Sequence, residues 1–151
     1  EVFQRAQKEG FYLVAHAGEE ADFEYIYEAL DLLHIQRVDH GVQCITSGEL
    51  MKRLKKEQIP LTVCPNSNIE LKVFENYSHH NIKQLLDYGL NVTVNSDDPA
   101  YFKGYLNDNF INLYENLDLS KEDILKLVRN SFSSSFIDTS LKKEYLKKLE
   151  Y

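Results

Sequence analysis

Apolar positions in this chain follow two alternating patterns. The run at 11–15 is entirely apolar, the runs at 59–64 and 90–94 are mostly apolar, and a further short strand is expected at 36–40. Such runs are typical of strands covered on both faces. After the first run, Phe23, Ile26, Tyr27 and Leu30 fall at the spacing of one buried helical face. Strands that alternate with helices predict an α/β fold with a parallel sheet.

Capping patterns predict where further helices begin and end. Thr46 and Glu49 form a capping-box pattern that predicts a helix ending near Gln58. Pro65 closes the third strand, and a polar loop is expected through Asn76. The next helix, 82–88, stops at Gly89.

The chain after Pro99 changes character, since residues 107–119 mix aromatic residues with Asn and Asp, but it shows no domain boundary. Ser120 and Asp123 predict a capped helix, and a last helix is expected at 141–149. The serine-rich stretch 131–135 is interpreted as a helix terminus or turn rather than a linker. Residues 1–151 are therefore expected to belong to one domain.

Polar residues stand at the ends of the expected strands: His16, His40, Asn66 and Asp97. Catalytic residues of a (β/α)₈ TIM barrel occupy these positions, whereas a doubly wound sheet usually carries a Gly-rich loop after its first strand, which this chain lacks. Eight strands need about 250 residues. Four βα units in 151 residues therefore predict the C-terminal half of such a barrel, strands 5 to 8.

Composition limits the possible partners. The chain is 43% hydrophobic with a formal net charge of −7, which argues against nucleic acid and anionic membranes and favours a small molecule. The chain contains no run long and apolar enough for a membrane span. Its start shows no signal-peptide pattern and no methionine, so we expect the chain to be part of a longer protein. Two separated cysteines, Cys44 and Cys64, favour a reducing compartment, and we predict the cytoplasm.

Each candidate site residue also has an ordinary structural interpretation. His16 and His40 could be satisfied core histidines, and Glu19 could complement a helix dipole. Asp97 and Asp98 could belong to a simple turn. Two adjacent carboxylates at the end of a buried strand nevertheless repel each other unless a positive ion holds one of them, so a divalent metal is the alternative.

Other candidates receive no chemical role. His34, His79 and His80 are expected to be solvated or to cap helices. Cys64 is expected to be a small buried residue, since the local pattern puts no histidine near it. Four aromatic residues could wall a flat heterocycle or simply pack: Tyr101, Phe102, Tyr105 and Phe110.

Four motifs together carry a family resemblance: His16-Ala-Gly-Glu19, Asp39-His-Gly41, Cys64-Pro-Asn-Ser-Asn68 and Asn95-Ser-Asp-Asp-Pro99. The chain resembles the C-terminal half of the adenosine and adenine deaminase family of metal-dependent amidohydrolases. The sequence from Val94 to Phe102 is more similar to that of the adenine deaminases than to that of the adenosine deaminases.

The resemblance implies a role for each matching residue. His16 and Asp97 match zinc ligands, Glu19 matches a proton shuttle that also binds substrate, and His40 matches the histidine that orients the attacking water. Gly18 and Asp98 match purine-binding positions. The implied reaction of purine salvage is attack of zinc-activated water on C6 with loss of ammonia.

The resemblance also leaves alternatives open. The family's other two zinc ligands form a His-x-His pair on the first barrel strand, and this chain has no such pair in a usable position. The single Zn²⁺ is thus expected to need the N-terminal half of the barrel or a second chain. Adenosine deaminase is the nearest alternative activity, and an inactive half-barrel that needs a partner chain is the alternative of another class.

Overall fold

The fold is built on a small parallel sheet. In the computed structural model, which describes residues 1–150, the sheet contains β1 (Val14–Ala17), β2 (Arg37–His40), β3 (Leu61–Val63) and β4 (Val92–Val94). The strands lie in chain order, and each pairs in parallel with the next. The parallel α/β arrangement predicted from the sequence is therefore confirmed.

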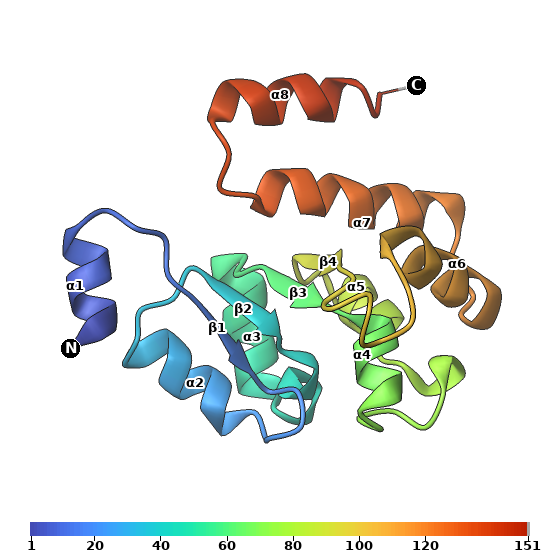
Figure 1. Cartoon of the computed structure of the whole chain (residues 1–151), viewed down its shortest axis with the longest axis horizontal. Helices are drawn as coiled ribbons and strands as arrows, with labels where there is room; N and C mark the ends of the chain where they lie inside the picture. The colour runs from blue at the N-terminus through green and yellow to red at the C-terminus, as the bar shows by residue number, and fades with distance from the viewer. Residues whose placement is uncertain (151) are drawn as a thin grey trace.

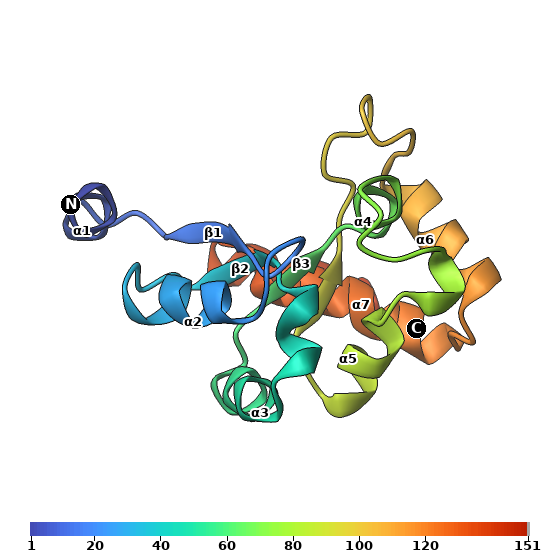
Figure 2. The same ribbon diagram turned by 90° about the horizontal axis from the view of Figure 1, so that it is seen from below.

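Three helices cover one side of the sheet. They are α2 (Glu24–Asp31), α3 (Gly48–Glu57) and α5 (Ile82–Tyr88), and Figure 2 shows them along the same side. Their buried faces include Ile26, Leu50 and Leu85, which pack against the strands' apolar residues, such as Val38 and Leu61. This layer forms the hydrophobic core.

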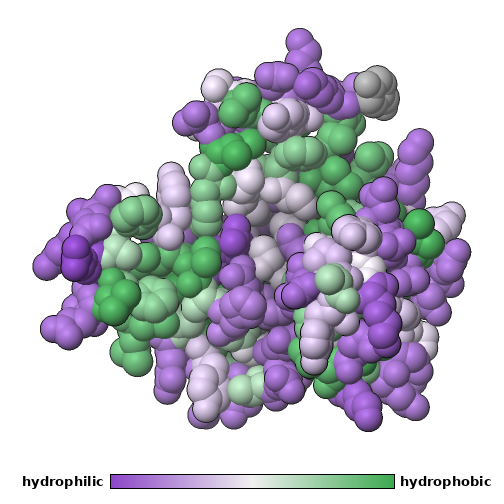
Figure 3. Space-filling model, in the orientation of Figure 1, coloured by the Kyte–Doolittle hydropathy of each residue, from purple (hydrophilic) through white to green (hydrophobic). Residues whose placement is uncertain are grey.

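The remaining helices flank this layer. α1 (Val2–Lys8) precedes the sheet, α6 (Leu106–Asn116) follows a long loop, and α7 (Lys121–Ser134) packs against β4. α8 (Thr139–Lys147) lies against α7, away from the sheet (Figure 1). Hydrophobic side chains gather where α8 meets the body and near α1 and β1 (Figure 3). No helix among residues 1–150 is long and apolar enough to cross a membrane.

Three local expectations were wrong. The predicted polar loop after β3 begins with a helix, α4 (Pro65–Glu70), because proline is well accommodated at the first helical position. The side chain that caps α3 is Ser47, whose Oγ accepts the N–H of Leu50, rather than Thr46. β1 begins at Val14 rather than at position 11, and Phe11 is exposed.

The sheet is open in the described residues. Its outer strands, β1 and β4, each pair on one side only. On the face opposite the helices, Asp39 accepts hydrogen bonds from Arg37 Nε at 3.1 Å and from Thr62 Oγ1 at 2.6 Å. As expected from strand alternation, Asp39 does not bond to His40. An uncovered polar face and two free edges are the geometry of part of a closed barrel.

Candidate active site

Most of the predicted site residues meet at the carboxyl edge of the sheet. His16 lies in β1, His40 ends β2, Cys64 follows β3, and Asp97 follows β4. Because the strands are parallel, these ends share one edge. His40 and Asp97 have left-handed backbones, with φ of 69° and 55°, which are uncommon for residues other than glycine.

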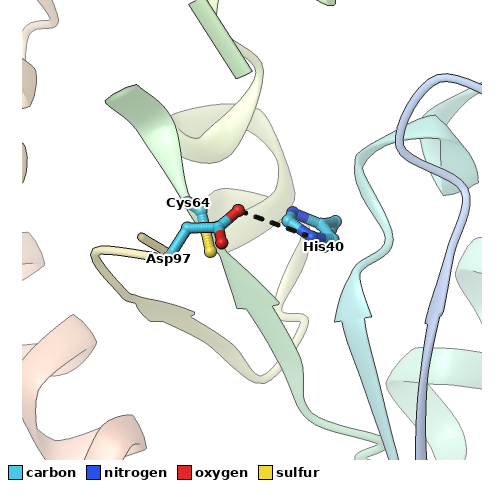
Figure 4. Close-up of side chains that lie close together, drawn as sticks. All are labelled: His40, Cys64 and Asp97. Atoms are coloured by element: carbon cyan, nitrogen blue, oxygen red, sulfur yellow. Dashed lines mark ion pairs between the residues drawn. The ribbon is translucent and has the colours of Figure 1, made fainter. Parts of the chain in front are cut away.

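His40 lies at the centre of this cluster and is almost fully buried. Its Nε2 is 3.0 Å from His16 Nδ1 and 4.0 Å from Asp97 Oδ2, the ion pair drawn in Figure 4. Its Nδ1 is 3.1 Å from Glu19 Oε1, without the alignment of a hydrogen bond. Burial lowers the pKa of His40, and nearby His16 lowers it further. The ring is therefore neutral at neutral pH.

Glu19 points into the same cluster from the β1–α2 turn. Its Oε1 accepts a hydrogen bond from Asn68 Nδ2 at 2.7 Å and a longer one from Ser67 Oγ at 3.4 Å. Oε2 has no hydrogen bond with residues 1–150. Burial raises the pKa of the Glu19 carboxyl, the Asn68 hydrogen bond opposes this, and Asp97 adds to the rise. A carboxyl of this kind is suited to carry a proton.

The residues at this edge fit one side of a zinc site. His40, Cys64 and Asp97 have ligand atoms within 4.8 Å of one another, and His16 is in contact with His40. Histidine nitrogen and carboxylate oxygen are common zinc ligands. His16 uses Nδ1 toward His40 and makes no hydrogen bond through Nε2 within residues 1–150, so Nε2 is free for a metal.

The position of Cys64 differs from what the sequence predicted. Cys64 is buried as predicted, but it lies beside His40 and Asp97 rather than far from any histidine (Figure 4). Burial raises the pKa of its thiol, and the carboxylates of Asp97 and Glu19 add to this effect. A protonated thiol is a weak metal ligand, so His16 and Asp97 remain the better donors.

Gly18 and Asp98 lie beside the cluster. Gly18 has φ of +63°, and an added Cβ would lie 2.7 Å from Ile26 Cγ1, so packing alone requires glycine here. Asp98 is exposed, and its Oδ1 accepts the backbone N–H groups of Ala100 and Tyr101, both at 3.1 Å. Oδ1 thus holds the turn that follows β4.

Several other predicted candidates lie elsewhere. Asn66 does not join the cluster: its Oδ1 accepts from Tyr77 and Asn112. Tyr101 and Tyr105 are exposed, and neither forms a wall in the described residues. Phe110 lines an apolar hollow of about 740 Å³ between α6, α7 and α8.

Sequence reasoning gave no chemical role to three buried polar residues that lie next to Glu19 or are linked to it by hydrogen bonds: Ser67, Asn68 and His80. The first two belong to a recognised motif, Cys64–Asn68, but had no individual role. His80 was expected to be solvated or to cap a helix; it is buried, and it does accept a backbone N–H at the start of α5. A polar run such as Asn66–Asn68 directly after a buried strand was the available signal.

The comparisons with known proteins identify the family. The sequence model described as "Adenosine deaminase" matches residues 1–151. The chain belongs to the adenosine deaminase family. It is 72% identical, over 99% of its length, to an adenine deaminase of Psychrobacter cryohalolentis, of which it covers 45%. This deaminase-family chain therefore spans a little under half the length of that relative.

Solved structures extend this result to the fold. The crystal structure of an adenine deaminase from Arthrobacter aurescens matches with a TM-score of 0.96 at 45% identity, over 98% of this chain and 45% of that one. An amidohydrolase from Burkholderia ambifaria, solved with bound Zn, matches with a TM-score of 0.89 at 25% identity, over 97% of this chain and 42% of that one. The α/β fold of a partial TIM barrel, as predicted, is confirmed.

Proposed function

We propose that residues 1–151 form the C-terminal part of a single hydrolase domain that deaminates adenine. The reaction converts adenine and water to hypoxanthine and ammonia, a step of purine salvage. The name of the 72% identical relative supports adenine as the substrate. The free cysteines Cys44 and Cys64 are consistent with a cytoplasmic location.

The observation that carries this proposal is the position of Glu19. Its carboxyl has a raised pKa, one hydrogen-bonded oxygen and one free oxygen, and it lies beside two histidines and an aspartate. Glu19 gives a proton to the ring nitrogen next to the reacting carbon, where the proton stays in hypoxanthine, and Glu19 then regains a proton from water. General acid and base catalysis of this kind contributes about 10²- to 10⁴-fold to rate.

The metal site is shared between this chain and the rest of the barrel. His16 and Asp97 hold zinc from this side, and two histidines from the N-terminal half complete the ligand set. When bound, zinc supplies Lewis-acid activation of water. Catalytic zinc usually has three or more protein ligands, so residues 1–151 alone are expected to bind it weakly.

Three residues orient the reactants. His40, which is neutral and buried, holds the attacking water in line with the purine. Asp98 uses Oδ2, the oxygen not bonded to the turn, to bind the imidazole side of the purine. Gly18 places its backbone against the base, in the left-handed turn that glycine permits.

Steady-state turnover by the complete gene product tests this proposal. We expect adenine to be deaminated with a kcat/KM at least about 100-fold above that of adenosine, because an adenine site need not admit a ribose. Removal of zinc by a chelator should abolish the activity, and added zinc should restore it.

The opposite results are equally informative. A preference for adenosine would show that the residues around Asp97 do not indicate which substrate is used. The N-terminal half of the barrel would then determine the substrate. Absence of turnover on both compounds, in a folded protein that contains zinc, would contradict the proposal and favour an inactive barrel.

A further inference from the structure

A buried row of hydrogen bonds connects Glu19 to the start of α5. His80 is 3% exposed and Asn68 is 0% exposed. His80 Nδ1 accepts the N–H of Ile82 at 3.1 Å, and His80 Nε2 lies 3.1 Å from Asn68 Oδ1. Asn68 Nδ2 in turn donates to Glu19 Oε1 at 2.7 Å.

The backbone sets the direction of every hydrogen bond in this row. Because Nδ1 of His80 accepts an N–H, it carries no proton, so the neutral ring carries its proton on Nε2 and donates to Asn68. Burial lowers the pKa of His80 to about 3, which keeps the ring neutral at ordinary pH. With its oxygen bound to His80, the Asn68 amide must present its NH₂ group to Glu19.

We propose that His80 is a positioning residue for Glu19 and acts through Asn68. This inference rests on the proposed function, in which Glu19 delivers a proton to the purine. The row holds Oε1 in place and leaves Oε2 as the oxygen that faces the substrate. Without the His80 donor, the Asn68 amide is free to turn its oxygen toward the carboxylate, and the two oxygens then repel each other.

Two variants of His80 separate this role from a local structural one. In His80→Gln, the side-chain amide reaches about as far as Nε2 and keeps a donor for Asn68. In His80→Asn, the shorter side chain reaches about as far as Nδ1 and keeps an acceptor for Ile82. Both variants lose the ring contact with Phe74, whose centroid lies 4.4 Å from that of His80, so this loss cancels in the comparison.

We expect the two variants of the complete protein to differ in kcat. His80→Asn should lower kcat at least about tenfold relative to His80→Gln, while KM should change by less than kcat, because Glu19 is displaced but the proposed contacts of Gly18 and Asp98 with the substrate remain. Equal kcat values, or a faster His80→Asn enzyme, would show that His80 only caps α5 and would overturn the proposal.

A double mutant tests whether His80 acts through Asn68. Asn68→Asp keeps an oxygen for His80 but replaces the donor to Glu19 with a second carboxylate oxygen. Once this link is broken, adding His80→Asn should lower kcat by no more than about twofold further, because the effects are not additive. If the fold reductions in kcat of the two single variants multiply in the double mutant, His80 and Asn68 act independently, which would contradict the proposal.

A measurement without substrate separates the failure of this inference from failure of the proposed function. Histidine ¹⁵N NMR of the complete protein should show His80 neutral, with its proton on Nε2, from pH 6 to 8. A proton on Nδ1 would overturn the row of hydrogen bonds even in an active adenine deaminase. Where the protein prefers adenosine, the kcat comparison applies to that substrate; loss of all deaminase activity in the wild type would overturn both proposals.

Discussion

Buried His80 links the stability of this fold to pH. Burial holds its pKa near 3 in the folded state, whereas an unfolded histidine has a pKa of about 6.5. Below pH 6.5 the unfolded chain therefore binds a proton that the folded chain does not. The free energy of unfolding thus falls as the pH falls, by about 1.4 kcal/mol per pH unit between these two values.

His80→Gln should remove this pH dependence. Relative to the variant, the wild type should lose about 2 kcal/mol of unfolding free energy between pH 7 and pH 5. Urea unfolding of both complete proteins at the two pH values measures the difference. His40 and Glu19 titrate in both proteins, so their effects cancel. Parallel pH dependence of wild type and variant would contradict the assignment of a neutral, buried ring.

The sequence predicts individual site residues where a motif marks the end of a strand. His16, Glu19, His40 and Asp97 were named from their motifs, and the structure brings them together. Asn68 and His80 could not be assigned in this way. The contact between Glu19 and Asn68 joins residues 49 positions apart, and only the folded chain shows which polar groups are buried together.

At the scale of elements, the turn between β1 and α2 depends on Gly18. Alanine at this position should destabilise the fold by about 2–4 kcal/mol, because a left-handed backbone costs about 1 kcal/mol or more and the new Cβ overpacks the core. The Cβ would press on Ile26, whose side chain is fully buried. Urea unfolding of the complete protein measures this loss.

Gly10 provides a matched control. Its φ is +85°, but an added Cβ would meet nothing within 4 Å. Gly10→Ala should therefore show the backbone cost alone, about 1 kcal/mol. If the two alanine variants lose the same stability, the contact with Ile26 is not what requires glycine in the turn.

Local patterns predicted most elements because apolar spacing and caps act over a few residues. Ser120 caps α7 through its Oγ, as expected, and Gly89 ends α5. The 131–135 stretch ends α7. α4 was missed because its sequence, Pro65–Glu70, contains three buried polar residues and no apolar stripe. Tertiary hydrogen bonds rather than helical periodicity hold it in place.

At the scale of the whole molecule, the open sheet makes this chain prone to association. β1 and β4 each have an unpaired edge in the described residues, and parallel strands usually need cover on both faces. The 151-residue chain produced alone should form dimers or larger assemblies at micromolar concentration, which light scattering after gel filtration would detect. Addition of the N-terminal half should reduce this association, whereas a monomer at every concentration would show that the edges are already protected.

The left-handed backbones of His40 and Asp97 imply a conflict between the stability of the fold and its activity. Glycine at either position would relieve about 1 kcal/mol or more of backbone strain, yet it would delete a side chain that the proposed chemistry needs. At His40 the cavity left by the buried ring would cost more than this relief, whereas at the exposed Asp97 selection for stability alone would favour glycine. A descendant of this protein that lost its catalytic role should therefore accept glycine at position 97, and this change in a genome would mark a barrel that no longer works as an enzyme.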